Sequence, residues 1–215
     1  MFKQTIAAKH TTLDKDPLAK ENMLPRGSAL VTSSGDLSKQ GIDAIIHAAT
    51  GAMTKSGGIY EPTQDSIKHS VLNSFELLNA NNFNKLAVTF IGGSIFAGRI
   101  GITNEALAKI IVDACFASNP EASQFVIVIY KSVDVATFTK VITENYPKAD
   151  LKSVLKQGSV LDFSLHQCDT IMNAANMEVR FGGNLSGKIA TATGERTHID
   201  AEALADIKAF WASKS

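Results

Sequence analysis

The chain has few cysteines, no excess of either charge and no long apolar run. Cys115 and Cys168 lie in apolar stretches, where a thiol behaves as a small buried hydrophobe, which favours a reducing, intracellular compartment. Lysine plus arginine and aspartate plus glutamate number 21 each, so no basic field exists to attract nucleic acid. No run approaches the roughly 20 apolar residues of a membrane helix, and residues 1–15 lack a signal-peptide core. We therefore expect a soluble, cytoplasmic protein that binds neither membranes nor nucleic acid.

Hydrophobic residues make up 45% of the 215 positions, so the sequence can bury a sizeable core. Residues 1–26 are polar and weakly patterned, with Pro17 and Pro25 interrupting them, and we expect an N-terminal arm there. From residue 27 onward the pattern becomes regular. Because the length fits one domain better than two, we expect a single domain at residues 27–215.

Short apolar runs alternate with segments whose apolar residues recur at helical spacing. The runs predict strands at 28–32, 42–48, 85–91, 125–130, 151–156 and 168–172. The spacing predicts helices around 67–78, 107–114, 135–142 and 187–192, and a last helix along 204–211 that begins behind Asp200. This alternation is typical of an α/β fold, and we expect a three-layer α/β/α sandwich with a mixed, mostly parallel central sheet.

Two glycine-containing turns each follow an expected strand, one at residues 92–98 and one at residues 181–187. Beyond the carboxyl ends of parallel strands, such turns let backbone N–H groups approach phosphate oxygens, and a helix that begins there adds its dipole. Two such turns indicate a diphosphate. Either turn taken by itself is also typical of an ordinary strand-to-helix connection.

Asn173 and Asn176 lie at the end of the strand expected at 168–172. A carboxamide supplies both donors and an acceptor for ribose hydroxyls. The alternative is that Asn176 only caps or turns the chain. The five histidines share no ligand spacing with the cysteines, so the sequence supports no metal site, and no cofactor is expected.

Segments from the last third of the chain resemble the opening third of a macro domain. They are Gly158-Ser159-Val160, Asn173-Ala174-Ala175-Asn176 and the loop with its helix start at 182–189. Residues 27–146 resemble the rest of that family, yet they come first in the chain. The rotated order implies a circularly permuted macro domain, in which residues 149–215 correspond to the family's N-terminal third and residues 145–150 join the usual ends.

The resemblance implies that the ligand is ADP-ribose, free or attached to a protein. Asn176 would contact the distal ribose and is the candidate catalytic residue, the two loops would clasp the diphosphate, and Tyr130 would pack near the adenine. The ligand-binding residues implied in this way are Ser159, Val160, Asn173, Ala174, Asn176, Gly182, Gly183, Asn184, Leu185, Ser186, Gly92, Gly93, Ser94, Ile95, Phe96 and Tyr130.

Some positions depart from the family pattern. Ser159 replaces an Asp that accepts the adenine amino hydrogen, and Ser186 stands where the hydrolysing members carry an Asp that orients water. A serine hydroxyl is a poor general base at neutral pH. His47 matches a histidine that the family often has, but an isolated strand histidine is more often structural than catalytic.

Binding of ADP-ribose is therefore the leading hypothesis. One alternative is a hydrolase that acts on ADP-ribosyl groups or O-acetyl-ADP-ribose, and another is an interaction module that has lost its ligand. A short-chain dehydrogenase also places Asn-Ala-Ala at a strand end. The chain lacks that enzyme class's N-terminal glycine turn and its Tyr-x-x-x-Lys pair, which argues against this last possibility.

Overall fold

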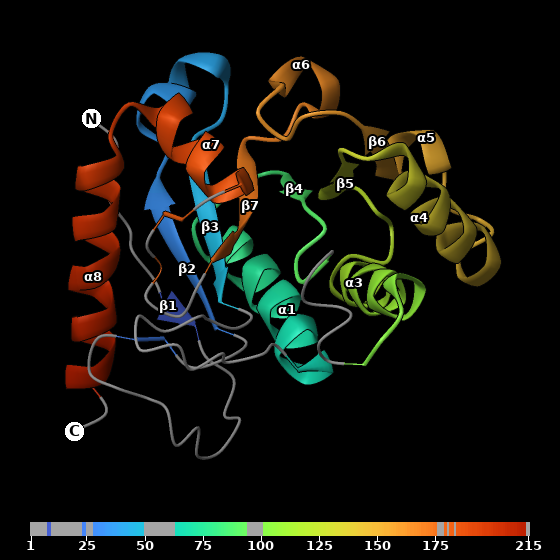
Figure 1. Ribbon diagram of the computed structural model, residues 1–215, viewed down its shortest axis with the longest axis horizontal. Coiled ribbons are helices and arrows are strands. Elements are labelled where there is room, and N and C mark those ends of the chain that lie inside the picture. The colour runs from blue at the N-terminus through green and yellow to red at the C-terminus, as the bar shows by residue number, and fades with distance from the viewer. Residues whose placement is uncertain are drawn as a thin grey trace.

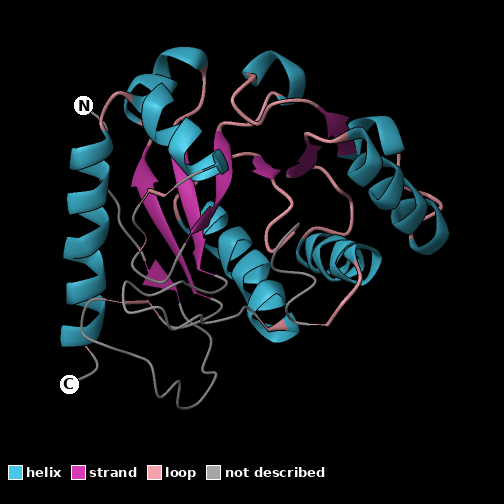
Figure 2. Ribbon diagram, viewed as in Figure 1, coloured by secondary structure: helices cyan, strands magenta, loops and turns pink. Residues whose placement is uncertain are grey.

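The computed structural model describes residues 8–9, 23–24, 28–49, 63–93, 101–175, 179, 181–182 and 184–213. Their strands form one sheet in the order β1-β2-β3-β7-β4-β5-β6, in the middle of the molecule (Figure 2). The strands are β1 (Ala8–Lys9), β2 (Ser28–Ser33), β3 (Ala44–Ala49), β4 (Leu86–Val88), β5 (Phe125–Ile129), β6 (Leu155–Gln157) and β7 (Thr170–Ala175). The pairs β1–β2 and β2–β3 are antiparallel and the others are parallel, which confirms a mixed, mostly parallel sheet.

Helices cover both faces of the sheet (Figure 1). They are η1 (Gly35–Gln40), α1 (Gln64–Ala80), α3 (Asn104–Ser118), α4 (Ser132–Asn145), α5 (Leu151–Val154), α6 (Phe163–His166), α7 (Asn184–Thr193) and α8 (Arg196–Ala212). Side chains of α1, α3 and α4 form one core with strand residues such as Ile46. Those of η1, α6, α7 and α8 form a second core with Ile45 and other residues of the opposite face. The expected three-layer sandwich is therefore confirmed.

β5 is an uninterrupted apolar run that contributes side chains to both cores. All five of its side chains are buried. Phe125, Ile127 and Ile129 belong to the core under α1, α3 and α4, whereas Val126 and Val128 belong to the core on the other face. Successive side chains of a strand point to opposite faces, so a strand covered on both sides must be apolar at every position.

The strand β1 and the helices η1 and α6 were not expected, and two of the expected elements differ in the structure. The strand expected at 151–156 begins as the helical turn α5, because the Asp150 carboxylate accepts the Lys152 N–H at 3.1 Å and caps that turn. The last helix begins at Arg196, so Asp200 lies within α8 rather than before it. Glu195, the residue before α8, makes no side-chain capping bond, and the true start therefore lacks a sequence signal.

β7 differs from its neighbours β3 and β4 in the layer of the helix that follows it. β3, β4 and β5 are followed by α1, α3 and α4 of one layer, whereas β7 is followed by α7 of the other. β7 lies between β3 and β4 and pairs with β3 along its whole length (Figure 1). Its ladder with β4 ends at Ile171 and Ala87, after which the Thr89 hydroxyl donates to the Met172 carbonyl at 3.0 Å. In open α/β sheets, ligands bind beyond the strand ends at such a change of layer.

Candidate functional site

Asn173 lies in the carboxyl half of β7, and only 1% of its surface is exposed. Its Nδ2 donates to His47 Nδ1 at 3.1 Å and to Ser186 Oγ at 3.3 Å. Its Oδ1 has no hydrogen-bond donor among the described residues. An unpaired buried acceptor is unfavourable by about 1–3 kcal/mol, so this oxygen has capacity for a donor from a ligand or water.

His47 of β3 supports Asn173 as a neutral, fully buried ring. Because Nδ1 accepts from Asn173, the proton lies on Nε2, which donates to Thr32 Oγ1 over 2.9 Å. The ring of Phe181 meets it edge-on at a centroid distance of 5.5 Å. Burial lowers the pKa of His47 from 6.5 to about 3. With both ring nitrogens occupied, His47 has a structural role, as its isolated position in the sequence favoured.

The glycine loop before α7 packs closely on one side and is open on the other. The Gly182 N–H donates to Ser186 Oγ at 3.4 Å. A Cβ on Gly187 would lie 2.8 Å from the Gly182 carbonyl oxygen, so only glycine fits there, whereas a Cβ on Gly182 would meet no atom of the described residues within 4 Å. The first N–H groups of α7 have no partner within their own helix and favour an anion.

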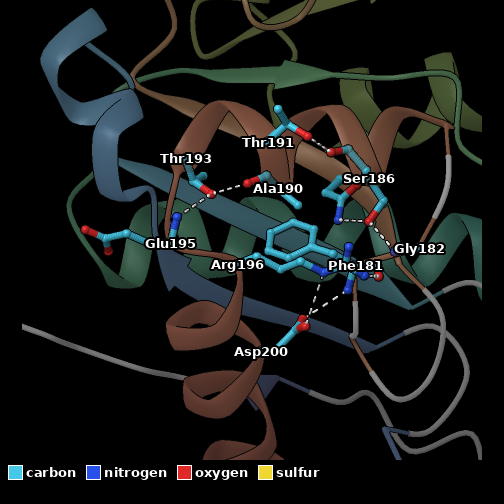
Figure 3. A network of polar contacts seen from close by, with 11 residues as sticks. Phe181, Gly182, Ser186, Ala190, Thr191, Thr193, Glu195, Arg196 and Asp200 are labelled. Carbon is cyan, nitrogen blue, oxygen red and sulfur yellow. Dashed lines mark hydrogen bonds and ion pairs between the residues drawn. The ribbon is translucent and has the colours of Figure 1, made fainter.

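Two side chains of α8 hold the main chain of Phe181 on either side of its Cα (Figure 3). The Phe181 N–H donates to Asp200 Oδ1 at 3.0 Å, and Arg196 Nη2 donates to the Phe181 carbonyl oxygen. Arg196 Nε lies 3.8 Å from Asp200 Oδ2, so the two residues also form an ion pair. Neither was expected at the site. Their i, i+4 spacing in the sequence predicts an ion pair between them, but it does not predict that both bind the main chain of Phe181.

Tyr130 follows β5 and is exposed over 72% of its surface. The ammonium of Lys188, on α7, lies 5.2 Å from the centre of its ring. Ser159 is also close to this strand end, because the preceding Gly158 N–H donates to the Ile129 carbonyl at 3.0 Å. The structure therefore brings Tyr130 and Ser159 to the same sheet edge, with Lys188 of α7 reaching Tyr130.

Several expected ligand-binding residues use their side chains for packing. Val160 is buried in the core of η1, α6, α7 and α8, and Leu185 packs against that core. Ala174 packs against the other core. Gly92 follows β4 with a positive φ of 71°, which favours glycine. Asn176, Gly183, Ser94, Ile95, Phe96 and the side chain of Asn184 lie outside the described residues, so their expected roles stay predictions.

Comparisons with known proteins add no relative. No protein-family model matches the chain, and no curated protein matches it either. Within the described ranges, no three or more histidine, cysteine, aspartate and glutamate side chains are grouped to hold a metal ion. None of the helices in those ranges is long and apolar enough to cross a membrane. The candidate function therefore depends on the geometry around β7 and α7.

Proposed function

We propose that the protein binds ADP-ribose, free or attached to a protein, as a circularly permuted macro domain. One observation carries the proposal. Asn173 and the glycine loop, which carry the family resemblance, meet through Ser186 at the carboxyl end of β7, whose following helix α7 lies in the layer opposite to the helices that follow β3 and β4. That is the position at which open α/β sheets bind nucleotides.

Each part of ADP-ribose finds suitable chemistry at this edge. The N-terminus of α7 offers the diphosphate N–H groups that have no partner within the helix, and Lys188 adds a positive charge. The Oδ1 of Asn173, which has no donor among the described residues, can accept a hydrogen bond from a ribose hydroxyl, whereas the diphosphate of ADP-ribose has no proton to donate at neutral pH. Tyr130 presents an exposed ring against which adenine can stack.

The surroundings of Ser186 favour binding over hydrolysis. Its Oγ accepts hydrogen bonds from Asn173 Nδ2 and from the Gly182 N–H. The side chain is buried and holds the loop against β7. A serine hydroxyl engaged in this way is not a general base at neutral pH, so we do not assign it the activation of water.

The packing near the ends of the domain supports the permutation. Trp211 Nε1, near the end of α8, donates to the Met23 carbonyl, just before β2, at 2.7 Å. The segment that would join the family's usual ends lies between α4 and α5. There residues 146–149 form a tight turn, in which the Ala149 N–H donates to the Tyr146 carbonyl. Chain ends that lie close together permit rotation of the chain order.

Calorimetric titration with ADP-ribose tests the proposal, and Gly182→Leu provides the decisive variant. Gly182 has open space beside it and a φ outside the left-handed region, so leucine should leave the fold intact while filling the place of the diphosphate. We expect wild-type protein to bind and Gly182→Leu to show no binding at an unchanged unfolding midpoint. Ala117→Leu, an exposed change at the end of α3, is the matched control and should bind normally. Absence of heat with folded wild-type protein and submillimolar ADP-ribose would reject the proposal.

A further inference from the structure

The chain just before the glycine loop is held in an unfavourable conformation. Val179 has a φ of +55°, a region that a β-branched residue rarely adopts. Such a conformation persists only where surrounding contacts determine it. The Val179 side chain is buried in a cluster with Ala203 and Ile207, both of α8. Packing against α8 therefore holds the chain at this point.

α8 also holds the loop two residues later, through polar contacts. Asp200 accepts the Phe181 N–H and Arg196 donates to the Phe181 carbonyl oxygen, so both peptide groups that flank its Cα are fixed (Figure 3). The next N–H along the chain, that of Gly182, is the one that Ser186 accepts. The position of Gly182 against α7 therefore depends on how α8 places Phe181.

We propose that Arg196 and Asp200 are positioning residues that set the glycine loop against the ligand. This inference rests on the proposed function, since the ligand is the one assigned to that loop. Neither side chain needs to touch the ligand. Together they keep the Phe181 main chain in place, so that Gly182 packs against Gly187 and the outer side of the loop stays open for the diphosphate.

The test combines binding with amide hydrogen exchange in the free protein. Asp200→Ala removes the acceptor of the Phe181 N–H, and we expect at least about tenfold weaker ADP-ribose binding. The Gly182 amide should also exchange faster, although its own acceptor, Ser186, is unchanged. Asp200→Asn keeps a carboxamide oxygen that can accept the same N–H, and it should restore most of the affinity.

Two further variants complete the comparison. Arg196→Ala alters a side chain that is 57% exposed, so it should fold even where Asp200→Ala does not, and it should show the same two effects. Lys208→Ala, an exposed change on the same helix, is the control and should match wild type.

Failure of the proposed function and failure of this inference give different results. Wild-type protein that binds no ADP-ribose rejects the function, whatever the Gly182 exchange rates. Wild-type protein that binds, with Arg196→Ala and Asp200→Ala binding equally well and Gly182 exchanging at the wild-type rate, overturns the positioning role. Weaker binding in both variants, with faster Gly182 exchange and rescue by Asp200→Asn, supports it.

Discussion

Asp169, just before β7, and Asn173, within its carboxyl half, differ in how fully their oxygens are hydrogen-bonded. Asp169 Oδ2 accepts from the main-chain N–H and the side-chain amide of Asn84 at 2.8 and 2.9 Å, and its Oδ1 accepts from the Lys85 N–H at 3.1 Å. Asn173 donates both hydrogens of its amide, yet its buried Oδ1 has no donor within the described structure.

This difference indicates that the amino end of β7 has a structural role, whereas its carboxyl end retains a hydrogen-bond acceptor for a ligand. At the amino end, protein groups alone satisfy the carboxylate, so that end fixes β7 beside the segment that enters β4. At the carboxyl end, the buried Oδ1 of Asn173 has no donor among the described residues, an arrangement that a protein built only for stability would avoid. The three predictions below run from the largest to the smallest expected change in the free energy of unfolding.

Acid should weaken the carboxyl end through His47. Its folded pKa of about 3 lies below the ordinary 6.5, so between these values the unfolded chain binds a proton that the folded chain does not. Stability from this group is fully present well above pH 6.5, and well below that value it falls by about 1.4 kcal/mol per pH unit. From pH 6.5 to 4.5 we expect this group to reduce the free energy of unfolding by about 2.3 kcal/mol, measured by urea denaturation.

A histidine comparison isolates this effect. His47→Gln cannot take up the proton, so its stability should depend less on pH over the same range. His69→Gln, a change on the surface of α1, should keep the wild-type dependence. Parallel pH profiles for all three proteins would show that the buried ring does not govern the acid response.

Asp169→Ala should reduce the free energy of unfolding by about 2 kcal/mol, because the N–H groups of Asn84 and Lys85 lose a charged acceptor. ADP-ribose affinity should not change, since the substitution lies at the opposite end of β7 from the site. Asp169→Asn keeps one acceptor oxygen and should show a smaller loss. Denaturation and calorimetry measure the two quantities, and weaker binding without loss of stability would contradict the division between the two ends.

Asn173→Leu should reverse that pattern. The leucine leaves the buried Nδ1 of His47 without its donor, but it also removes the buried Oδ1 that has no donor among the described residues. These two effects offset each other, so we expect a net loss of only about 1 kcal/mol in stability. ADP-ribose affinity should fall at least about tenfold, since the acceptor for a ribose hydroxyl is gone. A variant that binds as wild type does would exclude Asn173 from ligand contact.

Local patterns predicted most of the fold, and failed where distant residues decide the structure. The run at 125–129 was recognisable as a strand because both of its faces are apolar. The turn of α5 was wrongly predicted as a strand. Its four residues fit both the helical and the strand spacing of apolar side chains, and only the cap by Asp150 distinguishes the two. The site shows the same limit. The pairing of Asn173 with His47 joins residues 126 positions apart, and no spacing rule links Arg196 to Phe181.

The position of β7 also bears on how the protein is made. Of the described strands it is the last in the chain but the fourth in the sheet, between β3 and β4. Until residues 170–175 leave the ribosome, β3 and β4 each present an unpaired edge, and the two parts of the sheet have no shared strand. Exposed edges of this kind promote aggregation, and pairings between distant residues form slowly. A nascent chain of this protein therefore depends on its final third for both solubility and a finished sheet.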